Sequence, residues 1–172
     1  ILIVSGEASG DLHGALLAKA IMALDPTAQL VGIGGPGMRA AGVSLVPGVP
    51  QLDVMGLIGL SAIPAMVQRV RAIRRVLKAE AWDLVVLIDN PGLNFHFARV
   101  AKAAGRRVLY YIAPQVWAWR PGRLKWIQRR VDHVVVILPF EPELYRRAGV
   151  RCTFVGHPLL DTVAPHYDRA KL

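Results

Sequence analysis

The strongest constraint on the fold is an alternation of short apolar runs with segments of helical periodicity. Five runs of strand length cover residues 1–5, 30–33, 84–88, 108–112 and 134–138. Near-continuous apolar strands separated by helices are typical of βαβ crossovers, which place helices on both faces of a parallel sheet. The 172 residues are 53% hydrophobic, enough for one buried core. The sequence therefore predicts an α/β fold with a Rossmann-like parallel sheet, helices on both faces, and one domain over residues 1–172.

The segments between these runs carry apolar residues at the three- and four-residue spacing of amphipathic helices. The predicted buried faces are Leu12, Leu16, Ala20 and Leu24 in the first helix, and Leu93, Phe97, Val100 and Ala104 in a later one. Gly105 and Gly149 are predicted to end helices before the strands that follow, because glycine readily adopts the left-handed conformation of a helix C-terminus.

Residues 66–78 predict a basic amphipathic helix. Its apolar face would contain Met66, Val70, Ile73 and Leu77, and its basic face Arg71, Arg74, Arg75 and Lys78. Most helices of this kind pack on a sheet and leave their charges in water. A role at a membrane interface is the alternative interpretation.

Charge and cysteine content narrow the classes of partner and compartment. The net charge of +9 favours an anionic partner, which could be nucleic acid, acidic lipid or a phosphorylated substrate. The single cysteine, Cys152, lies in an apolar stretch and predicts a buried thiol in a reducing compartment. We expect a slightly trimmed native start without a signal peptide, and the longest apolar stretch, residues 54–67, is too short to span a bilayer.

The first strand is followed by the glycine-rich sequence Ser-Gly-Glu-Ala-Ser-Gly-Asp, residues 5–11. The helix that it opens has free N–H groups that could bind an anion or sugar hydroxyls. The glycine spacing matches neither a dinucleotide-binding loop nor a P-loop. Ser9 and Asp11 could instead only cap the helix, whereas capping does not explain Glu7. A second glycine-rich loop, residues 34–37, is interpreted as a turn into a short helix.

The fourth predicted strand ends at Asp89, directly before Asn90 and Pro91. Proline suits the first position of a helix and Asn90 then suits the N-cap, so capping leaves Asp89 unexplained. A carboxylate at this end of a parallel strand can take a proton from a hydroxyl nucleophile. The alternative is a loop carboxylate that binds nearby amides.

Tryptophans and cations are interleaved after the fifth predicted strand, from residues 113–120 through Arg123, Lys125, Trp126, Arg129 and Arg130. Such a segment can stack bases, pack on sugars or acyl chains, or hold phosphates. A solvated basic helix with its tryptophans in the core is the alternative. The motif Gly156-His157-Pro158 could likewise be structural or functional, because a lone histidine is more often structural than catalytic.

Six motifs occur in order along nearly the whole chain. They are Ser-Gly-Glu-Ala-Ser-Gly-Asp at 5–11, Asp-Val-Met-Gly at 53–56, Asp-x-Pro-x-x-Asn at 89–94, Pro-Gln-Val-Trp-Ala-Trp-Arg at 114–120, Leu-Pro-Phe-Glu at 138–141 and Phe-Val-Gly-His-Pro at 154–158. Together they resemble the lipid-A-disaccharide synthase family. The resemblance rests on these motifs, because the Rossmann-like pattern alone hosts many functions.

The resemblance implies the amino-terminal, acceptor-side half of a GT-B glycosyltransferase. Such an enzyme joins UDP-2,3-diacylglucosamine to 2,3-diacylglucosamine 1-phosphate with inversion, giving a β-1,6-linked disaccharide 1-phosphate and UDP, without a metal or cofactor. It would act at the anionic cytoplasmic face of the bacterial inner membrane. The complete enzyme could also be a homodimer. The carboxy-terminal donor domain is not part of residues 1–172, so we expect no turnover by this chain alone.

The resemblance also implies roles for particular residues. Asp89 would be the catalytic base that takes the proton of the acceptor's 6-hydroxyl. The residues expected to bind substrate are Glu7, Ser9, Gly10, Asp11, Met55, Gly56, Asn94, Gln115, Trp117, Trp119, Arg120 and His157.

Three other functions stay open at this point. The charge is compatible with a standalone basic domain that binds anionic lipid or RNA, although no RNP, KH or helix-turn-helix signature is present and we therefore expect no nucleic-acid partner. A nucleotide-dependent oxidoreductase is disfavoured by the glycine spacing of the first loop. A GT-B transferase with another acceptor is the more serious alternative.

Overall fold

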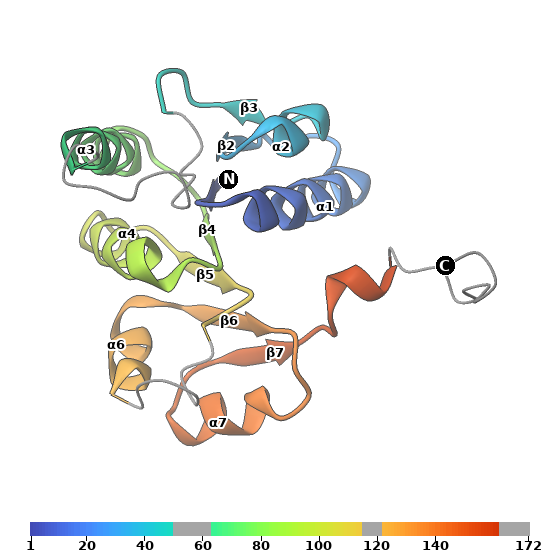
Figure 1. Ribbon diagram of the computed structural model, residues 1–172. Coiled ribbons are helices and arrows are strands. Elements are labelled where there is room, and N and C mark those ends of the chain that lie inside the picture. Colours follow the sequence, from blue (N-terminus) through green and yellow to red (C-terminus); the bar gives the residue numbers. More distant parts are fainter. Residues whose placement is uncertain (50–62, 115–121, 162–172) are drawn as a thin grey trace.

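The computed structural model describes residues 1–49, 63–114 and 122–161. Its centre is a parallel sheet with the strand order β3-β2-β1-β4-β5-β6-β7 (Figure 1). The strands are β1 (Leu2–Ser5), β2 (Val31–Ile33), β3 (Ser44–Leu45), β4 (Val85–Ile88), β5 (Val108–Tyr111), β6 (His133–Val136) and β7 (Cys152–Phe154). The predicted Rossmann-like sheet is confirmed. Neither β3 nor β7 is among the five predicted runs, because strands of two and three residues are too short to show a period, although a strand was predicted to follow Gly149.

Helices cover both faces of this sheet, as predicted. One face carries α1 (Ala8–Leu24) and α2 (Pro36–Ala40), and the other carries α3 (Ile63–Ala79), α4 (Pro91–Ala103), α6 (Arg123–Arg130) and α7 (Glu141–Arg147) (Figure 1). A short 3₁₀ helix, η3 (Pro158–Asp161), follows β7. None of the helices in the described parts of the chain combines the length and apolarity that a bilayer span requires.

The core has two layers because successive strand residues point to opposite faces. In β1, Leu2 and Val4 pack toward α3, α4, α6 and α7, whereas Ile3 packs toward α1 and α2. The larger layer is filled by fully buried helix residues such as Ile73 and Phe97. Burying one such side chain contributes roughly 1.5–3 kcal/mol to the free energy of folding. The strands are therefore fixed between two apolar layers, which sets the positions of the loops at their ends.

The predicted buried face of the first helix is wrong. Leu12 is 46% exposed and Leu24 is 88% exposed, Ala20 is exposed and Leu16 is only half-buried. The buried residues of α1 are instead Gly10, Asp11, His13, Gly14, Ala15 and Ala18. A Cβ atom on Gly14 would lie 2.7 Å from Met38 Sδ. The helix thus lies too close to its neighbours for leucine, and the close packing selects small residues that hydrophobic periodicity overlooks.

The other helix predictions hold in the described residues. Phe97 and Val100 of α4 are buried, and Leu93 and Ala104 are half-buried. In α3, Ile73 and Leu77 are buried and Val70 is half-buried, while the side chain of Met66 lies outside the described residues. The predicted basic face is exposed, as expected for Arg71, Arg74, Arg75 and Lys78. The two predicted terminal glycines, Gly105 and Gly149, have φ of 74° and 68° and follow α4 and α7.

Candidate active site

The loops after β1 and β4 meet where the chain reverses its direction across the sheet. From β1 the chain crosses to β2 on one side, and from β4 it crosses to β5 on the other. The two strands are neighbours and end together, since Ser5 pairs with Ile88. In open α/β sheets this switch point is where a crevice forms and ligands bind. The residues that follow Ser5 and Ile88 are therefore the first candidates for a site.

Glu7 and Asn90 connect these two loops. Glu7 occupies the N-cap of α1 but makes no capping bond with its side chain. Its Oε1 atom accepts a hydrogen bond from Asn90 Nδ2 at 3.1 Å. Gly6 permits this approach, because a Cβ atom there would lie 2.6 Å from Asn90 Nδ2. The prediction that capping does not explain Glu7 is confirmed.

Asp11 caps a helix other than its own. Its buried carboxylate accepts hydrogen bonds from three backbone N–H groups at the start of α2: Oδ1 from Gly35 at 2.8 Å and Met38 at 3.0 Å, and Oδ2 from Gly37 at 2.8 Å. Residues 34–37 thus form the predicted turn into a short helix. A Cβ atom on Gly37 would lie 2.9 Å from Asp11 Oδ2, so glycine is needed there. With its oxygens engaged in this way, Asp11 fixes the second loop against the first.

The interpretation of Ser9 and Asp11 as caps of the first helix is wrong, because α1 already begins at Ala8. Ser9 lies exposed in the first turn and Gly10 is buried against Ser5, where a Cβ atom would meet Ser5 Oγ at 2.7 Å. The first turn of α1 therefore has no side-chain cap, and its N–H groups lie beside the switch point.

The backbone of Asp89 is held in an unusual conformation. Asp89 and Asn90 have φ of 47° and 39°, the left-handed region that costs a non-glycine residue roughly 1–2 kcal/mol. The Asp89 carbonyl accepts hydrogen bonds from Asn94 Nδ2 at 2.7 Å and Tyr110 Oη at 2.9 Å, and its N–H donates to the Tyr111 carbonyl at 3.1 Å. Three contacts thus fix the backbone of Asp89, from which its side chain projects.

Neighbouring residues complete this arrangement. Asn90 is the predicted N-cap of α4, and its Oδ1 accepts a hydrogen bond from Leu93 N–H at 3.3 Å. Asn94, expected from the resemblance to bind substrate, is 2% exposed, and its Nδ2 also donates to the Ile88 carbonyl at 2.9 Å. Asn94 therefore supports the backbone of the strand end. Direct contact between Asn94 and a substrate stays a prediction.

The Asp89 carboxylate has no hydrogen-bond partner among the described residues, whose bonds to Asp89 all involve its backbone. The alternative of a loop carboxylate bonded to nearby amides thus finds no support in this part of the chain. The Asp89 charge also affects a neighbouring tyrosine. Burial raises the pKa of Tyr110 well above its ordinary value, and the negative charge of Asp89 raises it further. A half-buried carboxylate on a fixed backbone is a suitable proton acceptor.

Sequence reasoning missed a histidine, His13, whose pKa is affected by the charge of Asp89. His13 is 8% exposed on the buried face of α1, and its ring centroid lies 6.4 Å from that of His157. Burial lowers the pKa of His13, His157 lowers it further, and Asp89 opposes both. The structure thus brings His157, one of the predicted substrate-binding residues, to the edge that carries Asp89. The available signal for His13 was its spacing from Gly10 and Gly14, which mark the close-packed face of α1.

Several predicted residues lie outside the described residues, namely Met55, Gly56, Gln115, Trp117, Trp119 and Arg120. The described part of the basic segment favours the solvated-helix interpretation. Trp126 packs on Phe95 with ring centroids 4.4 Å apart, and the Arg130 guanidinium lies 4.5 Å from the Trp126 ring centroid. Cys152 is half-buried, and burial raises its pKa to about 11, so it stays a thiol at neutral pH. The described residues contain no cluster of three or more potential metal ligands.

Comparison with known proteins places this geometry in a family. A family model described as lipid-A-disaccharide synthetase matches residues 1–172. A lipid-A-disaccharide synthase of Geobacter metallireducens is 49% identical over 172 residues, 99% of this chain and 45% of the relative. One of Coxiella burnetii is 43% identical over 173 residues, 100% of this chain and 46% of the relative. The chain thus spans less than half the length of these relatives, and it belongs to the lipid-A-disaccharide synthase family.

Proposed function

We propose that residues 1–172 form the acceptor-side domain of a GT-B glycosyltransferase. The reaction joins UDP-2,3-diacylglucosamine to 2,3-diacylglucosamine 1-phosphate and gives a β-1,6-linked disaccharide 1-phosphate and UDP. Family membership supports this reaction, and a second Rossmann-like domain would supply the UDP-sugar site. The observation that carries the proposal is the fixed Asp89 backbone at the switch point, with a carboxylate that has no partner among the described residues.

The chemistry requires one base. The acceptor's 6-hydroxyl oxygen attacks the anomeric carbon of the donor, a carbon–oxygen bond forms, and the bond from that carbon to the UDP oxygen breaks. A single displacement of this kind inverts the anomeric centre. The hydroxyl proton passes to the Asp89 carboxylate, and UDP leaves with the electron pair of the broken bond. General base catalysis of this type contributes typically ~10²–10⁴-fold to the rate.

The surrounding groups would position the substrates. The first turn of α1, with Ser9 and Gly10, offers N–H groups and a hydroxyl to sugar or phosphate oxygens, because no side chain caps it. Glu7 is bound to Asn90 and keeps the two loops together. Asp11 holds the second loop in place through its bonds to α2. These contacts support a preorganised site at the carboxyl edge.

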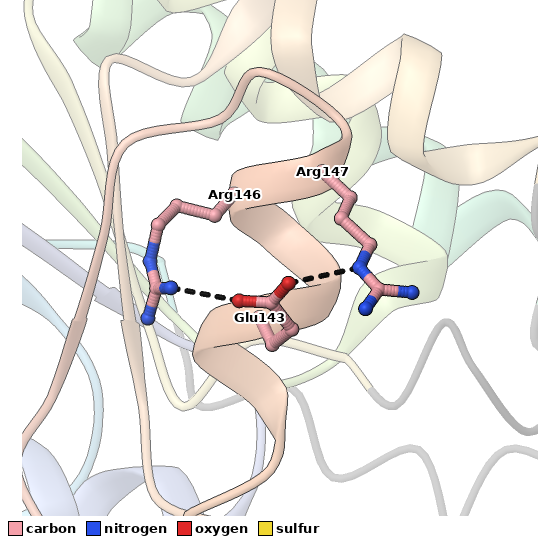
Figure 2. Close-up of polar contacts among 3 residues, drawn as sticks. All are labelled: Glu143, Arg146 and Arg147. Atoms are coloured by element: carbon pink, nitrogen blue, oxygen red, sulfur yellow. Dashed lines mark hydrogen bonds and ion pairs between the residues drawn. The ribbon is translucent and has the colours of Figure 1, made fainter.

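We also propose that the basic face of α3 binds the anionic cytoplasmic surface of the inner membrane. Its cations are exposed and form no ion pair with any described residue, whereas both arginines of α7 pair with Glu143, which offsets one of their two charges. Glu143 binds Arg146 at 2.7 Å and Arg147 at 2.9 Å (Figure 2). Each free cation near an anionic surface contributes about 1 kcal/mol, screened by salt. The unpaired charge of α3 supports a peripheral location, with Trp117, Trp119 and Arg120 as a second proposed contact.

The transferase proposal is tested with the full-length protein that contains this chain. We expect it to convert the two diacylglucosamine substrates to UDP and disaccharide 1-phosphate, and we expect residues 1–172 alone to fold without turnover. Activity only with a different acceptor would favour another GT-B transferase. Turnover by residues 1–172 alone would show that the division into acceptor and donor domains is wrong.

Vesicle binding tests the membrane proposal. The triple substitution Arg71→Gln, Arg74→Gln and Arg75→Gln should weaken binding to vesicles that contain anionic lipid, and wild-type binding should decrease with salt. The matched control is Arg146→Gln with Arg147→Gln, which removes cations that are paired with Glu143. Equal losses in the two variants, or binding that is independent of anionic lipid and salt, would contradict the proposal.

A further inference from the structure

Two imidazole rings lie beside each other at the carboxyl edge of the sheet. His13 comes from α1, His157 comes from the segment after β7, and their rings are inclined at 69° with centroids 6.4 Å apart. Asp89, from the loop after β4, is close enough for its charge to act on His13. Three separate segments therefore contribute two hydrogen-bonding rings and one carboxylate to the same edge of the sheet.

The hydrogen bonds indicate which ring nitrogens carry protons. His157 Nδ1 accepts a hydrogen bond from the Leu159 N–H at 3.3 Å, so the proton of the neutral ring is on Nε2. His13 Nδ1 is buried without a partner among the described residues. A proton on that atom would bury a donor without an acceptor, which is costlier than an unpaired ring nitrogen. We therefore assign the proton of His13 to Nε2 as well.

Packing alone does not require a histidine at position 13. The ring is more than nine-tenths buried, yet its Nδ1 bonds to none of the described residues. An apolar side chain of similar size would fill the same space without an unpaired nitrogen. The other nitrogen, Nε2, is not among the buried atoms that lack a partner, and it is the part of the ring that a ligand can use.

We propose that His13 is a positioning residue for the acceptor sugar, whose Nε2–H donates a hydrogen bond to a sugar oxygen next to the hydroxyl that Asp89 deprotonates. This inference rests on the proposed transferase function and deepens it. A sugar hydroxyl can both donate and accept a hydrogen bond. One sugar hydroxyl could therefore donate to the Asp89 carboxylate, which only accepts, while a neighbouring sugar oxygen accepts from the imidazole N–H of His13. A neutral donor suits an uncharged hydroxyl or ring oxygen rather than the acceptor phosphate. His13 itself forms and breaks no covalent bond.

The test uses the full-length protein and two substitutions at one position. His13→Leu replaces the ring by an apolar side chain of similar size and removes the donor, and we expect the KM for the acceptor to rise about tenfold with little change in kcat. His13→Gln keeps an N–H donor near the position of Nε2, and we expect its acceptor KM to stay within about threefold of the wild-type value. Both variants should melt near the wild-type temperature.

His96→Leu is the matched control. His96 also has a buried nitrogen without a partner in the described residues, but it lies on α4 near Arg74 and Arg99 rather than at the carboxyl edge. We expect wild-type kinetics from this variant. An unchanged acceptor KM in His13→Leu, or equal impairment of folded His13→Leu and His13→Gln, would overturn the inference while an active wild type upholds the proposed function. A wild-type protein without transferase activity would overturn the proposed function itself and this inference with it.

Discussion

Asn90 Nδ2 donates a hydrogen bond to Glu7 Oε1 at 3.1 Å, and this contact joins the two loops that flank the switch point of the sheet. The same asparagine accepts a hydrogen bond from Leu93 N–H and so caps α4. One side chain therefore links the start of α1 to the start of α4. The conformation of the proposed catalytic loop depends on both bonds.

Substitution of Asn90 tests this double role. We expect Asn90→Ala to lower the free energy of unfolding by about 2 kcal/mol, because it removes a helix cap and a hydrogen bond between the loops. Glu7→Ala removes only the second bond and should cost about 1 kcal/mol. Urea unfolding of both variants and of the double variant measures the coupling. Strict additivity would mean that the contact between Glu7 and Asn90 contributes nothing to stability.

Substitution of Asp11 should lower the free energy of unfolding more than substitution of Asn90 or Glu7. Asp11→Ala leaves the N–H groups of Gly35, Gly37 and Met38 without their acceptor, and we expect a loss of about 3 kcal/mol in the free energy of unfolding. The matched control is Asp25→Ala, because Asp25 is exposed and bonds only locally to Thr27. That control should cost less than about 1 kcal/mol. Similar losses in the two variants would show that the bonds to α2 are not what makes Asp11 important.

Asp89→Asn tests the proposed base in the full-length protein. Asparagine is nearly isosteric and the bonds to Asp89 in the described residues involve its backbone, so we expect an almost unchanged melting temperature and acceptor affinity. The amide cannot take the hydroxyl proton, and kcat should fall at least ~100-fold. Asp83→Asn, at the opposite end of β4, is the exposed control and should keep wild-type kcat. Normal turnover with a depressed melting temperature in Asp89→Asn would mark Asp89 as a structural carboxylate.

The two histidines with pKa values lowered chiefly by burial, His13 and His96, predict how stability depends on pH. Between about pH 7.5 and 5.5 the unfolded chain takes up protons on these rings at their ordinary pKa, whereas the folded chain resists protonation. The free energy of unfolding should therefore fall as the pH decreases through this window. The lowered pKa values of Asp132 and Glu143 act at more acidic pH.

Urea unfolding at three pH values within this window measures the effect. The double variant His13→Leu, His96→Leu should show a flatter dependence on pH, because two of the groups that bind protons preferentially in the unfolded state are gone. If the pH dependence of the double variant matched that of the wild type, other groups would have to cause it.

The sequence by itself determined the features that depend on near neighbours. Alternating apolar runs determined the parallel sheet, since strand burial on both faces leaves a pattern within a few residues. The Asn90 cap and the left-handed glycines at the ends of α4 and α7 also follow local rules. Asp89 was identified in the same way, as the residue that capping left unexplained. Its role in catalysis stays a prediction.

Only the tertiary structure decided which groups meet across long separations. Asp11 caps a helix that begins 25 residues later, and His13 lies beside His157 although 144 residues separate them along the chain. The buried face of α1 was mispredicted because glycine and alanine carry no hydrophobic period, yet they allow the closest packing. The hydrophobic pattern of a segment indicates how much apolar surface that segment must bury. Which partner it meets, and at what distance, is fixed by the shape of the surfaces once the whole chain has packed.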